Sequence, residues 1–409
     1  MKAKEKTLTP PVAMFDKPIY LGKTIPDFKH ATFYMEDYQH TISFLKSYNG
    51  SYGTFNAYRR EVERLLHWTW IIEKKSIKDL KRDDIENFIN FCQKPPREWI
   101  GLNRVLRFIE KEGARIPNPE WRPFVAHISK MKYREGETSS VDKYSLSSVS
   151  VKEIFSVLGS FYNFLLQEEY ATINPVALIR QKSKFVKKNQ GKVKIRRLSD
   201  LQWQYLIETV TQMADAEPEI YERSLFIISS LYSMYLRISE LAASDRWAPL
   251  MKNFYKDNNN HWWFLVVGKG NKERDIAVSN SMLAALKRWR KYLGLSPLPS
   301  PSDNSPILPR TKGIGPLAGT AYIRKIVQHC FDKTIDRLNQ DGFKEDAESL
   351  TGATVHWLRH TGISDDVKRR PREHVRDDAG HSSSATTDKY IDIQVQERHK
   401  SARDKPISQ

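Results

Sequence analysis

A lysine-rich stretch near the middle of the chain limits how the protein can fold. Residues 181–197 contain little apolar sequence and eight basic residues: Lys182, Lys184, Lys187, Lys188, Lys192, Lys194, Arg196 and Arg197. A segment of this composition is typical of an exposed linker. A chain of 409 residues is also long for one hydrophobic core. We therefore predict two domains, residues 37–180 and 198–393, with an N-terminal arm (1–36) and a C-terminal tail (394–409).

The composition favours a polyanionic partner. The formal net charge is +17 and the pI is about 9.5, and nucleic acid is the most common large polyanion that such a chain attracts. The two cysteines, Cys92 and Cys330, belong to no CxxC motif or Cys/His cluster, so neither a disulfide nor a structural zinc site is expected. No stretch approaches the roughly 18 to 20 apolar residues of a membrane span. These features predict a cytoplasmic, DNA-associated protein without a bound metal.

The first domain is predicted to be all helical. Apolar residues recur at helical spacing from Phe55 to Thr69, while Arg59, Arg60 and Arg64 fall on the opposite face. This pattern predicts an amphipathic helix with a basic outer stripe. The three arginines are candidate DNA contacts, and so are the six lysines of the linker, which could follow the phosphates as a tether.

Helix signals continue along this domain. Asp83–Asp84 opens a short helix that ends at Pro95–Pro96, and Ser150 with Glu153 has the spacing of a capping box for a helix closed by Asn174–Pro175. The sequence assigns no role to residues 94–148. The arm before the domain is rich in proline and has no clear period, so we expect it to order only against a partner or DNA.

The second domain combines helices with one hairpin. Ser199 and Gln202 form an N-terminal cap, and helices follow as far as Leu241. The apolar run 262–267 and the segment 274–278 flank a glycine-rich turn and predict a β-hairpin with charged residues at its tip. Helices resume at Met282, and the residues from Ser296 to Pro316 are predicted to form a surface loop.

Seven residues of this domain could together break and rejoin a phosphodiester bond. That chemistry needs a nucleophile that stays attached to phosphorus, positive charge around the phosphorane and an acid for the leaving oxygen. A tyrosine can attack, arginine forks can hold the phosphate, a lysine at a glycine-flanked tip can protonate the leaving 5' oxygen, and histidines can exchange hydrogen bonds or protons. The candidate catalytic residues are Tyr390, Arg237, Arg359, Lys269, His356, His381 and, as a supporting acid, Glu240.

Each of these residues also has an ordinary structural interpretation. One tyrosine among 18 is usually a packing residue, and Arg237 could be a surface group paired with Glu240. The lysine turn lacks the spacing of a phosphate-binding loop. His356 and His360 are spaced for zinc, but the glutamate of an HExxH site is missing and Arg359 would oppose a dication. The argument for chemistry therefore rests on the conjunction of the residues in this order.

In order and spacing the set resembles the active site of the tyrosine recombinases, the phage-integrase family. The resemblance covers residues 198–393 and rests on YLRISEL at 235–241, GKGNKER at 268–274, HWLRH at 356–360, and the nine-residue step from His381 to Tyr390. It matches each of the seven candidates to a catalytic position of the family. A looser resemblance links residues 37–178 to the family's helical core-binding domain.

The resemblance implies both a fold and a reaction. The fold would be mainly α with a small β-hairpin or sheet (α+β), in which a core-binding and a catalytic domain form a C-shaped clamp on DNA. The reaction would be site-specific recombination. Tyr390 would form a 3'-phosphotyrosyl link and free a 5' hydroxyl that attacks the partner strand, with no ATP, other cofactor or metal. The partners would be paired double-stranded DNA sites bound by a homotetramer, with room for accessory DNA-bending proteins.

Two other functions fit the same residues. A type IB topoisomerase would use this chemistry to relax any supercoiled duplex, and a non-catalytic DNA-binding protein could keep the clamp fold alone. One segment also departs from the family pattern. Residues 364–373 are strongly polar and end in a proline-containing stretch, where an apolar helix is usual, so local packing beside the site should differ.

Overall fold

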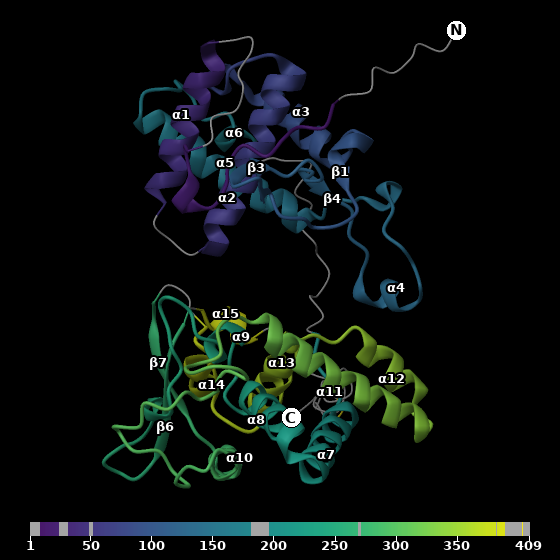
Figure 1. Ribbon diagram of the computed structural model, residues 1–409, viewed down its shortest axis with the longest axis vertical. Coiled ribbons are helices and arrows are strands. Elements are labelled where there is room, and N and C mark those ends of the chain that lie inside the picture. Colours follow the sequence, from purple (N-terminus) through teal and green to yellow (C-terminus); the bar gives the residue numbers. More distant parts are fainter. Residues whose placement is uncertain are drawn as a thin grey trace, which may run out of the picture. The chain divides into compact units, whose positions relative to one another are not determined.

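Helices dominate the computed structural model of the protein, which describes residues 9–23, 32–48, 52–180, 196–268, 271–381, 383–388 and 403. The chain divides into two compact units, Met1–Gln190 (unit 1) and Gly191–Gln409 (unit 2). Each unit has its own hydrophobic core and a few short strands among its helices (Figure 1). The expected fold class, mainly α with a small β component, is confirmed.

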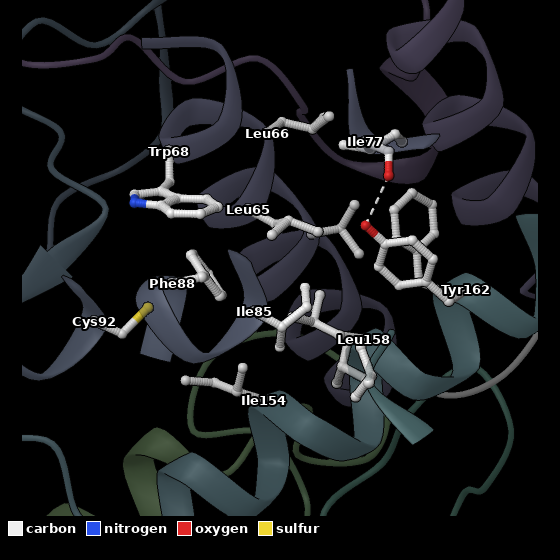
Figure 2. Packing of buried hydrophobic residues seen from close by; sticks show 14 of the residues in the cluster. Leu65, Leu66, Trp68, Ile77, Ile85, Phe88, Cys92, Ile154, Leu158 and Tyr162 are labelled. Carbon is white, nitrogen blue, oxygen red and sulfur yellow. Dashed lines mark hydrogen bonds between the residues drawn. The ribbon is translucent and has the colours of Figure 1, made fainter. Parts of the chain in front are cut away.

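Unit 1 is organised around α5, whose apolar residues recur every three or four positions and so form a continuous buried face. Figure 2 shows Ile154 and Leu158 of α5 packed with Ile85 and Phe88 of α3, and the hydroxyl of Tyr162 donates a 2.9 Å hydrogen bond to the carbonyl of Ile77. The helices of unit 1 are α1 (Thr32–Ser47), α2 (Tyr52–Trp68), α3 (Arg82–Gln93), α4 (Lys130–Arg134), α5 (Ser148–Gln167) and α6 (Ala177–Arg180).

The predicted helix ends around α5 are wrong. Its N-cap is Ser147, whose hydroxyl accepts from the backbone of Ser150, so Ser150 lies inside the first turn. The helix ends at Gln167, and Asn174 instead caps α6, accepting from the backbone of Val176 at 3.1 Å. Several serines precede α5, and spacing alone does not tell which hydroxyl reaches the free N–H groups.

The helix α5 is also long and apolar enough to pass a length-and-composition test for a membrane span. The expectation that no stretch comes near this limit is therefore wrong for α5. Within unit 1 its apolar face is covered by the core, as in the core helix of a globular domain.

The segment 100–125 contradicts the expectation of an all-helical first domain. It contains β1 (Ile100–Gly101), β2 (Phe108–Lys111), β3 (Ala114–Pro117) and β4 (Phe124–Val125). β2 and β3 form an antiparallel hairpin, and β1 pairs with β4 in parallel. Glu112 and Gly113 at the hairpin tip both have positive φ, the conformation that a two-residue hairpin turn requires.

Residues 9–23 pack on unit 1, so the expectation that the arm needs a partner or DNA to order it is wrong for this part. The ring of Phe15 is buried and stacks on Tyr38 at a centroid distance of 5.3 Å. The backbone N–H of Met14 donates to Glu63 at 2.6 Å, and Arg59 donates to the carbonyl of Asp16 at 2.7 Å. Residues 32–36, the last of the predicted arm, form the start of α1, and residues 1–8 and 24–31 lie outside the described residues.

Unit 2 surrounds α8, which is buried on most sides and packs against α7, α10, α11 and α13 (Figure 1). Its helices are α7 (Asp200–Ala216), α8 (Pro218–Ser233), α9 (Ile238–Leu241), α10 (Asn280–Tyr292), α11 (Ala321–Gln340), α12 (Lys344–Thr351), α13 (Val355–Asp366), α14 (Arg372–Ala379) and α15 (Ser384–Asp388). The Ser199–Gln202 cap is confirmed: the Ser199 hydroxyl accepts from the backbone of Gln202 at 3.1 Å.

The predicted hairpin is present as β6 (Trp262–Val267) and β7 (Glu273–Ala277), and an additional strand, β5 (Phe254–Lys256), completes an antiparallel sheet of order β5–β6–β7. Phe264 and Ile276 face each other across β6 and β7 and are fully buried. β7 lies beside α14. The sheet therefore brings a strand next to the end of α14, where the candidate site is found.

Candidate active site

Arg359 of α13 is buried, with 3% of its surface exposed. Its guanidinium donates to two backbone carbonyls, those of Tyr235 before α9 and of Ala379 at the end of α14, the latter at 2.6 Å. The Nη2 atom that donates to Ala379 also lies 3.3 Å from Nε2 of His381, which is a third hydrogen-bond contact of this guanidinium. The fork is thus held in one orientation by segments that lie far apart in the sequence.

Arg237 occupies the N-cap position of α9 and has extended backbone angles, φ −72° and ψ 144°. The expectation that it lies within a helix with Glu240 is therefore wrong, although the two side chains do pair, with Nη1 2.9 Å from Oε1 of Glu240. The side chain is 31% exposed. Its Nη2 lies 3.5 Å from the carbonyl oxygen of Gly380, so Arg237 approaches the same loop that Arg359 contacts.

Glu240 of α9 is buried, with 2% of its surface exposed. One carboxylate oxygen accepts from the backbone N–H of Arg237 at 2.8 Å, and the two oxygens together accept a fork from Arg274 at 2.9 and 2.8 Å. Burial opposes ionisation of Glu240, but the hydrogen bonds and charges of Arg274 and Arg237 outweigh burial and lower its pKa. One carboxylate is shared by two guanidinium groups, so the cluster keeps a net positive charge for a phosphate.

Arg274 is a site residue that the sequence argument did not single out. Besides its fork to Glu240, its Nε donates to the carbonyl of Asp378 at 2.9 Å and so joins β7 to α14. A Cβ at Gly380, whose φ is +64°, would come within 2.9 Å of Cδ of Arg274. The available signal was strand alternation: Arg274 shares a face of β7 with the buried Ile276, and an arginine there needs an acidic partner.

His381 is held as a neutral ring. Arg359 can only donate to Nε2, so Nδ1 carries the hydrogen and donates to the Thr387 hydroxyl at 2.9 Å. Burial, followed by the charges of Arg359 and Arg237, lowers the pKa of His381 to about 4. The residue is therefore a neutral hydrogen-bonding group near pH 7.

His356 and His360 lie on successive turns of α13 with their ring centroids 4.7 Å apart. Burial first, and then the neighbouring positive groups, lowers the pKa of His356 and brings that of His360 to about 4. Within the described residues no group of three or more His, Cys, Asp and Glu side chains is arranged to hold a metal ion.

The polar segment before Gly380 is built into unit 2 by ion pairs. Tyr235 is buried and has a positive φ of 48°, and its hydroxyl donates to Asp366. Arg370 donates to that hydroxyl at 3.0 Å and to Asp378 at 2.6 Å. Asp378 in turn accepts from the backbone of Ala277 in β7 at 3.3 Å. The charged side chains of this segment therefore pair with one another. They also bind Tyr235, whose carbonyl orients Arg359.

Two of the predicted catalytic residues, Tyr390 and Lys269, lie outside the described residues, as do all six predicted DNA-contacting lysines of the linker: Lys182, Lys184, Lys187, Lys188, Lys192 and Lys194. In the sequence, Tyr390 follows α15 by two residues and Lys269 lies between β6 and β7. The five remaining candidates, Arg237, Glu240, His356, Arg359 and His381, come together in unit 2.

The basic stripe expected on α2 is only partly exposed. Arg59 has 8% of its surface exposed and holds the N-terminal segment, so its predicted place on an outer face is wrong. Arg64 donates to the carbonyl of Pro123 at 2.9 Å, and Arg60 pairs with Glu153 at 2.9 Å. The N-terminal segment and the residues around β4 cover part of the face on which the helical period placed the three arginines.

Known proteins resemble the chain in sequence and in fold, although no protein-family model matches it. It is 25% identical over 344 residues to the tyrosine recombinase XerC of Xanthomonas axonopodis pv. citri, covering 84% of this chain and 87% of that protein. It is 25% identical over 259 residues to XerC of Alcanivorax borkumensis, covering 63% and 73%. A similar fold occurs in the site-specific recombinase XerH bound to a palindromic difH substrate in a post-cleavage complex, with a TM-score of 0.55, 16% identity and coverage of 97% of this chain and 99% of that chain.

Proposed function

We propose a residue-level mechanism from the premise that this chain belongs to the tyrosine recombinase family, enzymes that cut and rejoin DNA at specific sites. The premise rests on similarity to named tyrosine recombinases over most of the chain and on a shared fold. This similarity supports site-specific strand exchange and not the two other functions, topoisomerase-like relaxation and DNA binding without catalysis.

The observation that carries the mechanism is the convergence of two arginines on one loop. Arg359 from α13 donates to the carbonyl of Ala379 at 2.6 Å, and Arg237 from the start of α9 reaches the carbonyl of Gly380. Planar guanidinium forks bind phosphate oxygens from two sides and stabilise the extra negative charge of a phosphorane. The scissile phosphate would therefore be bound beside residues 379–381.

In the proposed reaction the Tyr390 hydroxyl loses its proton to solvent as its oxygen attacks the scissile phosphorus, and the bond from phosphorus to the 5' oxygen breaks. Lys269 gives a proton to that leaving oxygen, so the products are a 3'-phosphotyrosyl link and a free 5' hydroxyl. The 5' hydroxyl of the partner strand then reverses the step on the link. The number of phosphoester bonds is conserved, so the exchange needs no energy from a nucleotide.

The histidines would act as neutral groups at the phosphate. Because the pKa of His381 is lowered to about 4, we propose that its ring exchanges hydrogen bonds with the phosphate or the tyrosine and does not add a charge. His356, on the exposed side of Arg359, is proposed to contact a phosphate oxygen. Glu240 would position both Arg237 and Arg274 without contacting DNA.

The DNA contacts and the assembly belong to the same proposal. XerH was solved on its DNA site, and paired DNA sites bound by a homotetramer would give each strand exchange its partner. Accessory DNA-bending proteins and a cytoplasmic location at the DNA are part of this proposal. The linker lysines together with Arg60 and Arg64 remain predicted contacts to phosphate, whereas Arg59 is buried and holds the N-terminal segment.

A covalent-trapping assay tests the mechanism. Purified protein is mixed with nicked suicide duplexes taken from the DNA that flanks its own gene, and the products are separated on denaturing gels. We expect a protein–DNA adduct with the natural sequence and none with Tyr390→Phe, which should still bind the duplex. Arg359→Ala and Arg237→Ala should lose the adduct as well.

Tyr322→Phe is a matched control, because Tyr322 is an exposed tyrosine of α11 in the same unit. This variant should form the adduct like the natural protein. An adduct in Tyr390→Phe would show that another residue is the nucleophile. Normal binding without an adduct on every flanking site would remove the cleavage reaction from the proposal.

A further inference from the structure

A half-open groove of about 430 Å³ lies in unit 1, and none of its lining residues belongs to the candidate active site of unit 2. One wall is the outer face of α2, and the other is formed by the residues around β1 and β4, with the start of α5 at one end. The segment from residue 94 to 148, to which the sequence assigned no role, thus supplies much of the lining. We call it the arginine groove.

The groove is lined by six arginines and two glutamates. Two of the arginines are used by the fold: Arg59 donates to the carbonyl of Asp16, and Arg107 donates to the carbonyl of Phe15 at 3.1 Å and pairs with Glu63. Arg60 and Arg64 share Glu61 as a partner. The acids of the groove therefore fall short of neutralising its cations.

Arg104 and Arg122 carry the excess charge. Nη1 of Arg122 donates to the carbonyls of Pro119 and Trp121 at 2.6 and 2.7 Å, which orients the guanidinium without neutralising it. Nε of Arg104 donates to the ring of His127 at 3.2 Å. Burial, and then the charge of Arg104, lowers the pKa of His127, so this partner is neutral as well. Among the contacts of the described residues neither guanidinium has an acidic partner.

Arg64 adds a third cation of fixed orientation. Its Nε donates to the carbonyl of Pro123 at 2.9 Å, and its guanidinium lies over the ring of Phe124 at 4.6 Å from the centroid. Backbone carbonyls and an aromatic ring thus hold the arginine planes before any ligand arrives. Preorganised forks of this kind lose little conformational entropy on binding and match the oxygens of a phosphate.

We propose that the arginine groove binds phosphate groups of the DNA backbone and so makes the 94–148 segment a second DNA-contacting element of unit 1. The inference rests on the proposed function, which supplies DNA as the partner. Charge complementarity favours phosphate over an apolar or cationic ligand. The backbone of DNA presents phosphates at regular spacing to a chain with a formal charge of +17. A free phosphate ion would satisfy the same forks, and the test separates the two sources.

The test is a salt titration of DNA affinity with the full chain. Arg104→Gln with Arg122→Gln is compared with the natural protein on a short duplex of arbitrary sequence, because phosphate contacts do not read bases. Each lost contact should reduce the slope of log Kd against log salt by about 1 and weaken binding about fivefold near 0.15 M salt. Adduct formation at saturating protein should proceed at its normal rate, since neither residue belongs to unit 2.

The matched control is Arg82→Gln with Lys94→Gln, which removes two exposed positive charges of unit 1 that do not line the groove. We expect little change in the slope for this control. Arg104→Lys with Arg122→Lys keeps both charges and should restore most of the slope of log Kd against log salt. Thermal unfolding of the variants separates loss of charge from loss of fold. Equal slopes for the groove variant and the natural protein would overturn the inference.

Inorganic phosphate supplies the second arm. Calorimetry measures whether the natural protein binds phosphate ion saturably and whether Arg104→Gln with Arg122→Gln loses this binding. If it does, while the salt slope of DNA binding is unchanged, the groove is a free-anion site and the DNA contact is rejected. If the natural protein fails to bind DNA at all, the proposed function fails instead, so the two failures are distinguishable.

Discussion

Glu240 organises the candidate site at the scale of single residues, because one buried carboxylate positions two arginines from different elements. Arg237 precedes α9 and Arg274 lies on β7, and each reaches a backbone carbonyl of the Asp378–Gly380 segment. Removing either fork would leave a buried carboxylate short of partners, which costs more than the contact itself contributes.

Arg274→Lys tests this positioning role. Lysine keeps the charge but cannot bind both oxygens of Glu240 and the carbonyl of Asp378 together. We expect the rate of adduct formation to fall by about 10²-fold through misplacement of Arg237, while DNA affinity stays within about twofold. Arg324→Lys, at an exposed arginine of α11, serves as the control. A normal cleavage rate in Arg274→Lys would remove its positioning role.

Two histidines of unit 2 have a strongly lowered pKa and predict a pH dependence of the stability of this unit. His360 and His381 titrate near pH 4 in the folded chain and near 6.5 when unfolded. The unfolded chain therefore binds more protons between these values, and the free energy of unfolding of unit 2 should decrease as pH falls from about 6.5 to about 4. Replacing both by glutamine should flatten this slope between pH 6.5 and 5, where carboxylates contribute little. An unchanged slope would contradict the lowered pKa values.

At the scale of elements, the approach of α13 to α8 depends on a single glycine. A Cβ at Gly362 would overlap the carbonyl oxygen of Tyr232 and crowd the ring of Tyr235. The helices cannot separate without displacing Arg359, which lies on the same helix and contacts Tyr235. Helix packing and placement of a candidate catalytic residue are therefore coupled.

Gly362→Ala should destabilise unit 2 by about 3 kcal/mol, because the clash outweighs the better helix propensity of alanine. Gly159→Ala in α5 is the matched control. It is also a helical glycine, but its added Cβ would meet only Val176, at 4.0 Å, so propensity should raise stability by about 0.5–1 kcal/mol. Denaturant unfolding of both variants measures the difference, and equal effects would contradict the packing argument.

At the scale of the whole molecule, the chain is two separately packed units. The buried clusters of unit 1, with Trp68 and Trp99, and of unit 2, with Trp289, lie entirely within their own units. Each unit is large enough to bury a core of its own. The candidate active site and the arginine groove accordingly belong to different units, so we expect that DNA affinity and cleavage can be altered separately.

Fragments 1–190 and 191–409 should therefore each fold alone. We expect cooperative thermal unfolding of each fragment and the blue-shifted tryptophan emission of buried indoles. The thermal unfolding transitions of the full chain should match those of the two fragments. A fragment with the emission of exposed tryptophan and no transition would show that its core needs the other unit.

The fold class, the hairpin, the Ser199 cap and the resemblance to tyrosine recombinases could be predicted from the sequence, because these depend on local periodicity and on motifs of fixed order. The pairing of Arg237 with Glu240 also followed from spacing, although the backbone at Arg237 proved extended. Tertiary structure alone decided which arginines are available. Arg59 became buried because residues 9–23 fold back onto α2, and Arg274 became a site residue because β7 meets the end of α14. Such contacts join residues tens to more than a hundred positions apart, and no local pattern in the chain records which distant segment will cover a given face.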